Sequence, residues 1–240
     1  MKKIKTSAIL LAAGSGKRMG GSVKKQFMLL KDKPLLYYPM KVFEESFIDE
    51  IVVVCSPDDE DFIRDEIISK YGFTKVVKMV PGGKERYDSV LCGLNAIDEC
   101  DYVFIHDGAR PMIDHETLKR GFEAVKKYDA CVIGVPSKDT VKIADEDNKV
   151  VSTPRRDLVW NIQTPQIFDF SLIKEAYTDV VGRADEYGKQ GISITDDAMV
   201  LELFNSHDIR LVEGSYRNIK VTTPEDIILA EAFLETEQGL

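Results

Sequence analysis

The sequence predicts one α/β domain, residues 1–240, built around a mostly parallel sheet, and two features indicate this class. Short apolar runs typical of buried strands recur along the chain, at residues 8–11, 51–55, 76–80, 102–105 and 130–135. Amphipathic segments of helical length separate these runs. Strands and helices that alternate in this way form βαβ units, in which helices cover both faces of a parallel sheet. A chain of 240 residues also buries enough surface to fold without a disulfide or a structural metal.

The helices are predicted from apolar side chains at helical spacing and from a proline near the start of a segment. They are expected at 34–43, 59–71, 115–128, 170–178, 195–204 and 224–234. One further strand is expected at 209–212. Ligands of such sheets bind at the carboxyl ends of the strands, so we expect the loops after Leu11, Val80 and Ile105 to carry the functional residues.

Residues 137–154 interrupt this alternation. Two short runs of alternating apolar and polar residues flank the polar turn at 145–148, which is typical of a β-hairpin. We expect a hairpin arm, spanning about 137–156, that stands away from the main sheet. On pattern alone, an ordinary surface hairpin is the simpler interpretation.

The composition argues against several kinds of protein. The chain has 32 basic and 41 acidic residues, a net charge of −9 and a pI near 5.0, which disfavours binding to nucleic acid or to anionic membranes. Its uncharged stretches are shorter than the roughly 20 residues that a membrane-spanning helix needs. The four cysteines form no CxxC pair, and two of them lie in apolar runs, as is typical of a reducing cytosol. We therefore expect a cytoplasmic protein without a zinc site.

A glycine-rich loop follows the first predicted strand. Residues 12–20 read AAGSGKRMG, and the backbone N–H groups of such a loop can approach a phosphate closely. From Lys17 to Lys33 there are six basic residues and one acidic residue, a local charge of +5 in a chain of −9. This predicts a pocket for a nucleoside triphosphate, with a solvated basic loop as the alternative. The loop is not a Walker A sequence, and Met19 stands where the dinucleotide fingerprint has its third glycine.

The opening loop, LAAGxGxRM followed by KQ, resembles that of the sugar- and alditol-phosphate nucleotidyltransferases. Further motifs follow in order: GGKERYDSV at 82–90, HDGARP at 106–111, KDT at 138–140, Arg156 with Trp160, QTPQ at 163–166, TDDA at 195–198 and NIKVT at 218–222. Together they resemble the 2-C-methyl-D-erythritol 4-phosphate cytidylyltransferase family of the non-mevalonate isoprenoid pathway, over nearly the whole chain. The resemblance implies a Rossmann-like three-layer nucleotidyltransferase fold. It also implies a reaction in which CTP is joined to methylerythritol phosphate and pyrophosphate is released.

The resemblance implies a role for each residue that matches a motif. The cations expected to act in catalysis are Arg18, Lys25, Arg156 and Lys220. The residues expected to bind the nucleotide are Ala12, Ala13, Gly14, Ser15, Gly16, Lys17, Gly83, Lys84 and Ser89. The residues expected to bind methylerythritol phosphate are Arg110, Thr140, Arg156, Thr164, Thr195 and Lys220. Asp107 is expected to bind Mg²⁺, the implied cofactor, together with the CTP phosphates.

Chemistry alone agrees with this reading, although individual residues have structural alternatives. The attacking phosphate monoester is largely dianionic near neutral pH, so the reaction requires no general base, and the sequence shows no Ser-His-Asp or Cys-His arrangement. Asp107 has the alternative of capping a local turn. Arg86 and Arg110 have the alternative of pairing with structural carboxylates. His106 precedes Asp107 in a strand and points to the opposite face, so we expect it to be structural.

The family also implies a homodimer, in which the arm of one subunit carries Thr140 and Arg156 into the site of its partner. Two positions depart from the family pattern: Lys24 replaces a common proline, and Lys84 replaces an acidic or small residue. Three other functions remain open from the sequence. They are a ribitol 5-phosphate cytidylyltransferase, a nucleotide-sensing module without catalysis, and a dinucleotide-dependent oxidoreductase, which the missing third glycine opposes.

Overall fold

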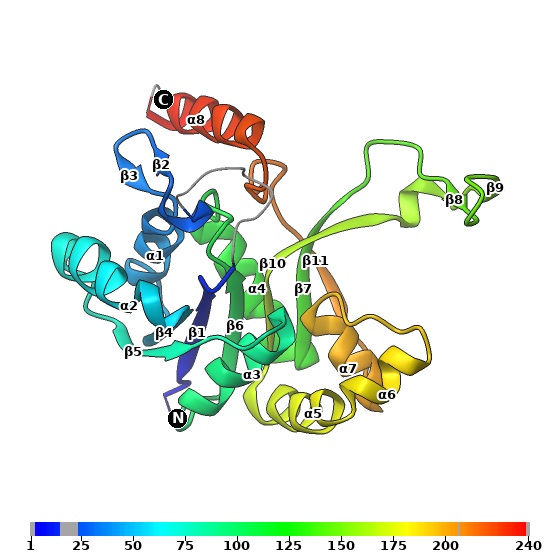
Figure 1. Cartoon of the computed structure of the whole chain (residues 1–240), viewed down its shortest axis with the longest axis horizontal. Helices are drawn as coiled ribbons and strands as arrows, with labels where there is room; N and C mark the ends of the chain where they lie inside the picture. The colour runs from blue at the N-terminus through cyan, green and yellow to red at the C-terminus, as the bar shows by residue number, and fades with distance from the viewer. Residues whose placement is uncertain (1–2, 15–23, 206, 239–240) are drawn as a thin grey trace.

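A seven-stranded sheet forms the centre of the computed structural model, which describes residues 3–14, 24–205 and 207–238 (Figure 1). In spatial order its strands are β11 (Arg210–Glu213), β7 (Ala130–Pro136), β10 (Trp160–Asp169), β6 (Tyr102–Asp107), β1 (Thr6–Leu11), β4 (Glu50–Cys55) and β5 (Val76–Pro81). All neighbouring strands are parallel except β10, which runs antiparallel to both β6 and β7. The predicted mostly parallel sheet is therefore confirmed.

Helices cover both faces of this sheet, which is why its inner strands are apolar on both sides. One face is covered by α1 (Tyr37–Glu44), α4 (His115–Tyr128) and a continuous helical stretch made of η3 (Pro57–Asp59), α2 (Glu60–Phe62) and η4 (Ile63–Ser69). The other face is covered by α3 (Arg86–Ala96), α5 (Phe170–Gly182) and α7 (Asp197–Asn205). The short helix α6 (Ala184–Lys189) follows α5. These three layers match the predicted architecture.

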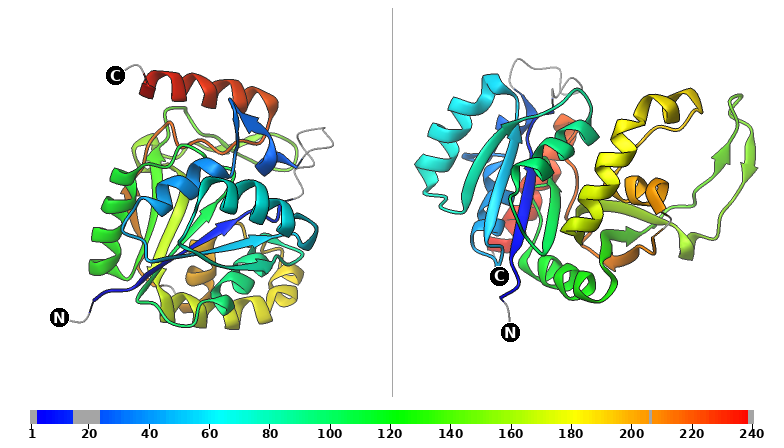
Figure 2. Two further views of the ribbon diagram at one scale, coloured as in Figure 1. Left: turned by 90° about the vertical axis from the view of Figure 1, so that its left-hand side faces the viewer. Right: turned by 90° about the horizontal axis from the view of Figure 1, so that it is seen from below.

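A smaller cluster lies beyond one end of the sheet (Figure 2). Here α8 (Pro224–Gln238) packs on the hairpin formed by β2 (Leu29–Leu30) and β3 (Lys33–Pro34). Leu30, Val221 and Ala230 are fully buried in this cluster. The Val221 N–H also donates to the Ala109 carbonyl, in the loop after β6, at 2.8 Å. The cluster therefore fixes the segment that carries Lys220.

The predicted hairpin arm is also confirmed. It contains β8 (Ile143–Ala144) and β9 (Val150–Ser152), which pair antiparallel, and it extends away from the body of the molecule (Figure 1). Asp145 shapes the turn, because its carboxylate accepts the N–H groups of Asp147 and Lys149 at 3.1 and 2.9 Å. Asn148 adopts φ +63°, a left-handed conformation that asparagine tolerates well.

The two longest elements not predicted from the sequence are β10 and α3, and the short β2, β3 and α6 were not predicted either. β10 carries buried Gln163, Thr164 and Gln166 around Pro165, so it lacks the apolar run of its neighbours. A register shift between Ile162 and Gln166 accommodates the proline within the ladder to β7. Helix α3 begins with a capping box of Glu85 and Asp88, which is less familiar than one led by Ser or Thr.

Several boundaries also differ from the prediction, among them the end of α8, which continues to Gln238 beyond the expected residue 234. The helix expected from residue 34 begins at Tyr37, since Pro34 belongs to β3. Helix α5 continues to Gly182, beyond the expected residue 178. Across the described parts of the chain, every helix is too short or too polar to cross a lipid bilayer.

Candidate active site

Three loops meet at the carboxyl edge of the parallel strands. Leu11 and Asp107 are register partners at the ends of β1 and β6, and the Gly108 N–H donates to the Leu11 carbonyl at 2.9 Å. The loop after β5 approaches from the other side, because a Cβ on Gly82 would lie only 2.5 Å from the Cβ of Ala13. The loops after β1, β5 and β6, which were predicted to carry the functional residues, therefore form one edge, where this kind of sheet binds its ligands.

Asp107 lies at the centre of this edge and contacts two cations. Its Oδ2 accepts from the Lys220 ammonium at 2.6 Å, and its Oδ1 accepts from Arg86 Nε at 3.2 Å. Burial alone would raise the pKa of Asp107, but the positive charges of Arg86 and Lys220 outweigh it and hold the pKa well below its usual range. Asp107 is therefore ionised throughout the physiological pH range.

Arg86 also binds a second carboxylate. Its two terminal nitrogens donate to the two oxygens of Asp197 at 2.7 and 2.8 Å, in the bidentate geometry that guanidinium and carboxylate favour. The Tyr177 hydroxyl donates to Asp197 at 2.5 Å. Burial opposes the charge on Arg86, yet Asp197 and Asp107 raise its pKa well above the ordinary value. Burial, with the charge of Asp197, likewise raises the pKa of Tyr177, which stays protonated.

A buried chain of hydrogen bonds fixes the backbone N–H of Asp107. The Asp107 N–H donates to the Thr164 hydroxyl at 3.0 Å, and that hydroxyl lies 3.1 Å from His106 Nδ1. Burial lowers the pKa of His106 to about 4, so its ring is neutral at pH 7. Thr164 then donates to Nδ1, and Nε2–H donates to the Arg110 carbonyl at 3.1 Å. His106 is structural, as predicted, and Thr164 holds Asp107 in place.

Arg110 ties the loop after β6 to the segment that carries Lys220. Its guanidinium donates to the carbonyls of Asn218 at 2.8 Å and Ile162 at 3.3 Å. Burial lowers the pKa of Arg110, although the nearby Asp107 charge opposes this. Its Nε has no hydrogen-bond partner among the described residues. The structure thus brings Arg110, Asp107 and Lys220 together, as the motifs predicted.

Three of the residues predicted to bind the nucleotide lie together at the start of α3: Gly83 and Lys84 in the loop before the helix, and Ser89 in its first turns. The Ser89 hydroxyl is buried, accepts the Gly83 N–H at 3.0 Å and donates to the Glu85 carbonyl at 3.1 Å. A Cβ on Gly83 would lie 2.2 Å from the Cβ of Asp88, so only glycine fits this close approach. Gly83 and Lys84 are both exposed and face solvent. Ser89 therefore shapes the loop, and the exposed backbone of Gly83 is available to a base.

The first loop is described only up to Gly14. The Ala12 N–H donates to the Val54 carbonyl at 2.7 Å, and the Ala12 carbonyl accepts from the buried Gln26 amide at 2.7 Å. Ala13 and Gly14 follow directly at the edge. The predicted residues Ser15, Gly16, Lys17 and Arg18 lie outside the described residues. The same holds for the side chain of Lys25, whose backbone begins the short helix η2 (Lys25–Phe27).

Lys24, one of the two departures from the family pattern, has a structural partner. Its ammonium lies 2.8 Å from both oxygens of Asp59, a buried carboxylate at the start of the α2 region. An ammonium engaged in this way is fixed to the protein, which leaves Lys25 as the cation of this pair expected to act on phosphate.

The remaining predicted residues are all exposed. Thr140 and Arg156 lie on the arm, and Arg156 donates to the Lys138 carbonyl at 3.3 Å. Thr195 precedes α7, and its hydroxyl contacts the Met199 sulfur at 3.6 Å. Figure 1 shows the arm extending away from the central sheet of its own chain.

A metal ion at this edge has one candidate protein ligand. Among the described residues, His, Cys, Asp and Glu side chains form no group of three that fits an ion. Asp107 supplies a single hard carboxylate, and each of its oxygens already accepts from a cation. Mg²⁺ in nucleotide enzymes binds through one or two carboxylates plus substrate phosphates and water. Asp107 therefore fits a Mg²⁺ ion whose other ligands come mainly from the triphosphate and water.

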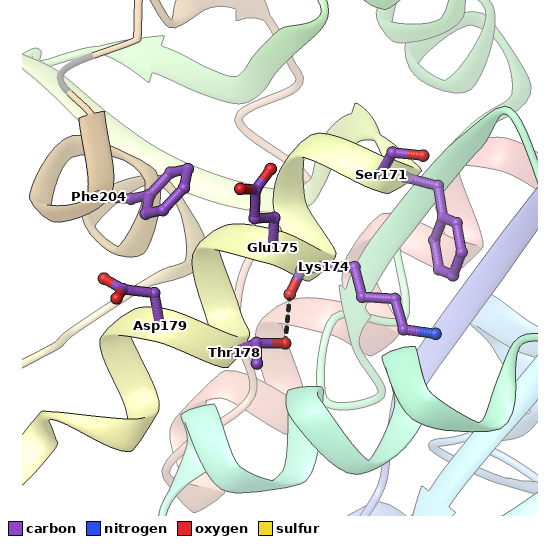
Figure 3. Close-up of a pocket in the computed structure, with 7 residues that line it drawn as sticks. Ser171, Lys174, Glu175, Thr178, Asp179 and Phe204 are labelled. Carbon is purple, nitrogen blue, oxygen red and sulfur yellow. Dashed lines mark hydrogen bonds between the residues drawn. The ribbon is translucent and has the colours of Figure 1, made fainter.

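A pocket of about 630 Å³ lies elsewhere, along one side of α5 (Figure 3). Its lining comprises Phe170, Ser171, Lys174, Glu175, Thr178, Asp179 and Phe204. The Thr178 hydroxyl donates to the Lys174 carbonyl at 2.8 Å, so it is engaged within the helix. None of these seven residues is among those predicted to bind substrate or nucleotide.

The fold and this edge define a class of protein. Cations gathered around one carboxylate, beside a glycine-rich loop at the carboxyl ends of parallel strands, suit phosphate transfer to or from a nucleotide. Comparison with known proteins specifies the family. The family model described as 2-C-methyl-D-erythritol 4-phosphate cytidylyltransferase matches residues 6–236. The chain belongs to this family and is thus a nucleotidyltransferase.

Individual relatives agree with this assignment. A protein of that name from Lachnoclostridium phytofermentans is 52% identical over 234 residues, which cover 98% of this chain and 98% of the relative. Another, from Clostridioides difficile, is 44% identical over 234 residues, covering 97% and 94%. The crystal structure of 4-diphosphocytidyl-2C-methyl-D-erythritol synthase from Anaerococcus prevotii superposes with a TM-score of 0.81 at 38% identity, covering 97% of this chain and 99% of that one.

Proposed function

We propose that this enzyme joins CTP to the phosphate of 2-C-methyl-D-erythritol 4-phosphate, giving 4-diphosphocytidyl-2-C-methyl-D-erythritol and pyrophosphate. The family match over residues 6–236 is the observation that carries the proposal. The cations around Asp107 supply a physical reason, because two anions must approach each other in this reaction. The product is an intermediate of the non-mevalonate isoprenoid pathway.

The chemical step is a displacement at phosphorus. An oxygen of the acceptor phosphate forms a bond to the α-phosphorus of CTP, while the bond from that phosphorus to the bridging oxygen breaks and its electrons leave with pyrophosphate. The acceptor is already largely dianionic, so no proton has to be removed from it. Catalysis then consists of positioning and of positive charge near the α-phosphate, the contribution expected of Lys220, Arg18 and Lys25.

Lys220 is well placed for this task. Its ammonium has three N–H donors, and one of them is used by Asp107. Its side chain is 36% exposed, so the other donors are accessible to a phosphate. Arg110 and Thr195 are proposed to bind the acceptor beside it, and Thr164 to act through Asp107. Ala12 to Gly14, with Ser15 to Lys17, are proposed to wrap the nucleotide, while Gly83, Lys84 and Ser89 form the base-binding loop.

Mg²⁺ is proposed as the cofactor, held by Asp107 together with the phosphates of CTP. When bound, it neutralises charge on the triphosphate and on the leaving pyrophosphate. Arg86 and Lys220 keep Asp107 ionised, which is the protonation state a hard cation requires.

A homodimer is proposed, with sites completed by the arm of the partner subunit. The arm carries Thr140 and Arg156 away from its own body, and its tip exposes apolar side chains. Ile143, Val150 and Val151 are 50, 58 and 65% exposed, more than a solitary surface hairpin favours. A cytoplasmic location is also proposed, since all four cysteines are free thiols.

Pyrophosphate release tests the proposed function directly. Purified enzyme is incubated with CTP, Mg²⁺ and either methylerythritol phosphate or ribitol 5-phosphate, and the initial rates are compared. The expected result is release that depends on methylerythritol phosphate, requires CTP and stops when Mg²⁺ is chelated. A higher rate with ribitol phosphate would identify the related enzyme. CTP binding without release for any acceptor would indicate a sensing module.

A further inference from the structure

We propose that Asp197 and Tyr177 are positioning residues for the transfer reaction. They hold Arg86 against Asp107, so that Asp107 keeps a counterion when Lys220 directs its charge to the substrate phosphate. The inference rests on the proposed function, because it assigns these residues a purpose within that site.

Arg86 connects two carboxylates that are far apart in sequence. Its terminal nitrogens bind both oxygens of Asp197, and its Nε faces Asp107 at 3.2 Å. Arg86 lies at the start of α3, Asp197 at the start of α7 and Asp107 at the end of β6. A guanidinium donates in one rigid plane, so the bidentate pair with Asp197 determines where Nε points.

Asp197 has no exposed surface, and neither does Tyr177. Removing a carboxylate from water is costly, and it is tolerated where strong hydrogen bonds compensate. Here Arg86 supplies two such bonds and the Tyr177 hydroxyl a third, all to the same group. Asp197 is thus fully engaged and has no exposed surface, so its effect on the reaction passes through Arg86.

The consequence concerns the charge of Lys220. Asp107 carries one negative charge and has two counterions: Arg86 contacts its Oδ1, and Lys220 contacts its Oδ2. If Arg86 lost Asp197, its partly exposed side chain would be free to turn toward solvent. Lys220 would then be the main counterion of Asp107, and less of its charge would act on an incoming phosphate. Asp197 and Tyr177 therefore raise phosphate affinity without touching the substrate.

A merely structural role predicts something different, and a double-mutant cycle separates the two. Calorimetry with a non-hydrolysable CTP analogue and methylerythritol phosphate gives the acceptor dissociation constant, which needs no turnover. Asp197→Asn should raise this constant about tenfold in the wild-type background. In an Asp107→Asn background, where no carboxylate competes for Lys220, the same substitution should change it less than twofold. Equal effects in both backgrounds would overturn the proposal.

A milder variant covers the case in which Asp197→Asn fails to fold. Tyr177→Phe keeps the ring and removes only the hydroxyl, and it should raise the acceptor dissociation constant about threefold, again only when Asp107 is present. Tyr128→Phe, at the surface end of α4, is the matched control and should have no effect. Unchanged acceptor binding in Tyr177→Phe would refute the role of Tyr177. Failure of the wild-type enzyme to release pyrophosphate would count against the proposed function instead.

Discussion

Replacing Lys220 by methionine tests the electrostatic account most sharply, because it removes one charge and keeps most of the length of the unbranched side chain. At an effective dielectric constant of about 20, a unit charge about 4 Å from a phosphate contributes about 4 kcal/mol. The Lys220 side chain is 36% exposed, so solvent screening reduces this to roughly 2–4 kcal/mol. Each 1.36 kcal/mol corresponds to tenfold in rate, so we expect kcat/KM to fall by roughly 30- to 1000-fold.

The measurement is the initial rate of pyrophosphate release with CTP and methylerythritol phosphate. Lys220→Arg keeps the charge and should retain more activity than Lys220→Met. Lys70→Met is a matched control. The Lys70 ammonium lies 2.8 Å from the Glu66 carboxylate, and both side chains are exposed at the end of η4. The thermal midpoint of Lys220→Met should stay close to wild type, since Asp107 retains Arg86. A kcat/KM within threefold of wild type would refute the reasoning.

Three further predictions follow from the fold and the site. Burial lowers the pKa of His106 to about 4, below the roughly 6.5 of an unfolded histidine. The free energy of unfolding should therefore fall by about 3 kcal/mol as the pH falls from 6.5 to 4. Urea titrations should show a smaller fall over the same pH range for His106→Gln. Gly83→Ala should raise the KM for CTP several-fold, because its Cβ would lie 2.2 Å from Asp88, whereas Gly188→Ala, with no atom within 4 Å, should not. Mixing inactive Lys220→Met and Arg156→Ala chains should restore about a quarter of wild-type activity. If each site is shared between two subunits, about half of the randomly formed dimers are heterodimers, and each heterodimer has one intact site of two. No recovery in the mixture would argue against shared sites.

Much of the fold could be predicted because the parallel strands are buried on both faces. β4 and β6 are nearly uninterrupted apolar runs, which the periodicity of the sequence shows directly. β10 could not be predicted in this way. Its buried glutamines and threonine are satisfied by distant partners, such as the Ser215 carbonyl for Gln163 and Asp196 for Gln166. Those partners become neighbours only after the chain has folded.

The same reason divides the site into predictable and unpredictable parts. Asp107 and Lys220 belong to motifs, so their sequence positions indicated a shared site, and the structure places them 2.6 Å apart. Asp197 also lies in a quoted motif, but its bond to Arg86 spans 111 positions and no local spacing reveals it. Tyr177 lies in a helix whose apolar pattern explains the ring, while the hydroxyl gives no signal in the sequence.

The central claim is that phosphate transfer takes place among the cations around Asp107. A crystal structure with the diphosphate product bound tests it most directly. We predict that the diphosphate lies within hydrogen-bond distance of Lys220 Nζ, with the cytosine against the loop that carries Gly83. A product bound instead in the pocket beside α5, with Lys220 still paired only to Asp107, would contradict the account.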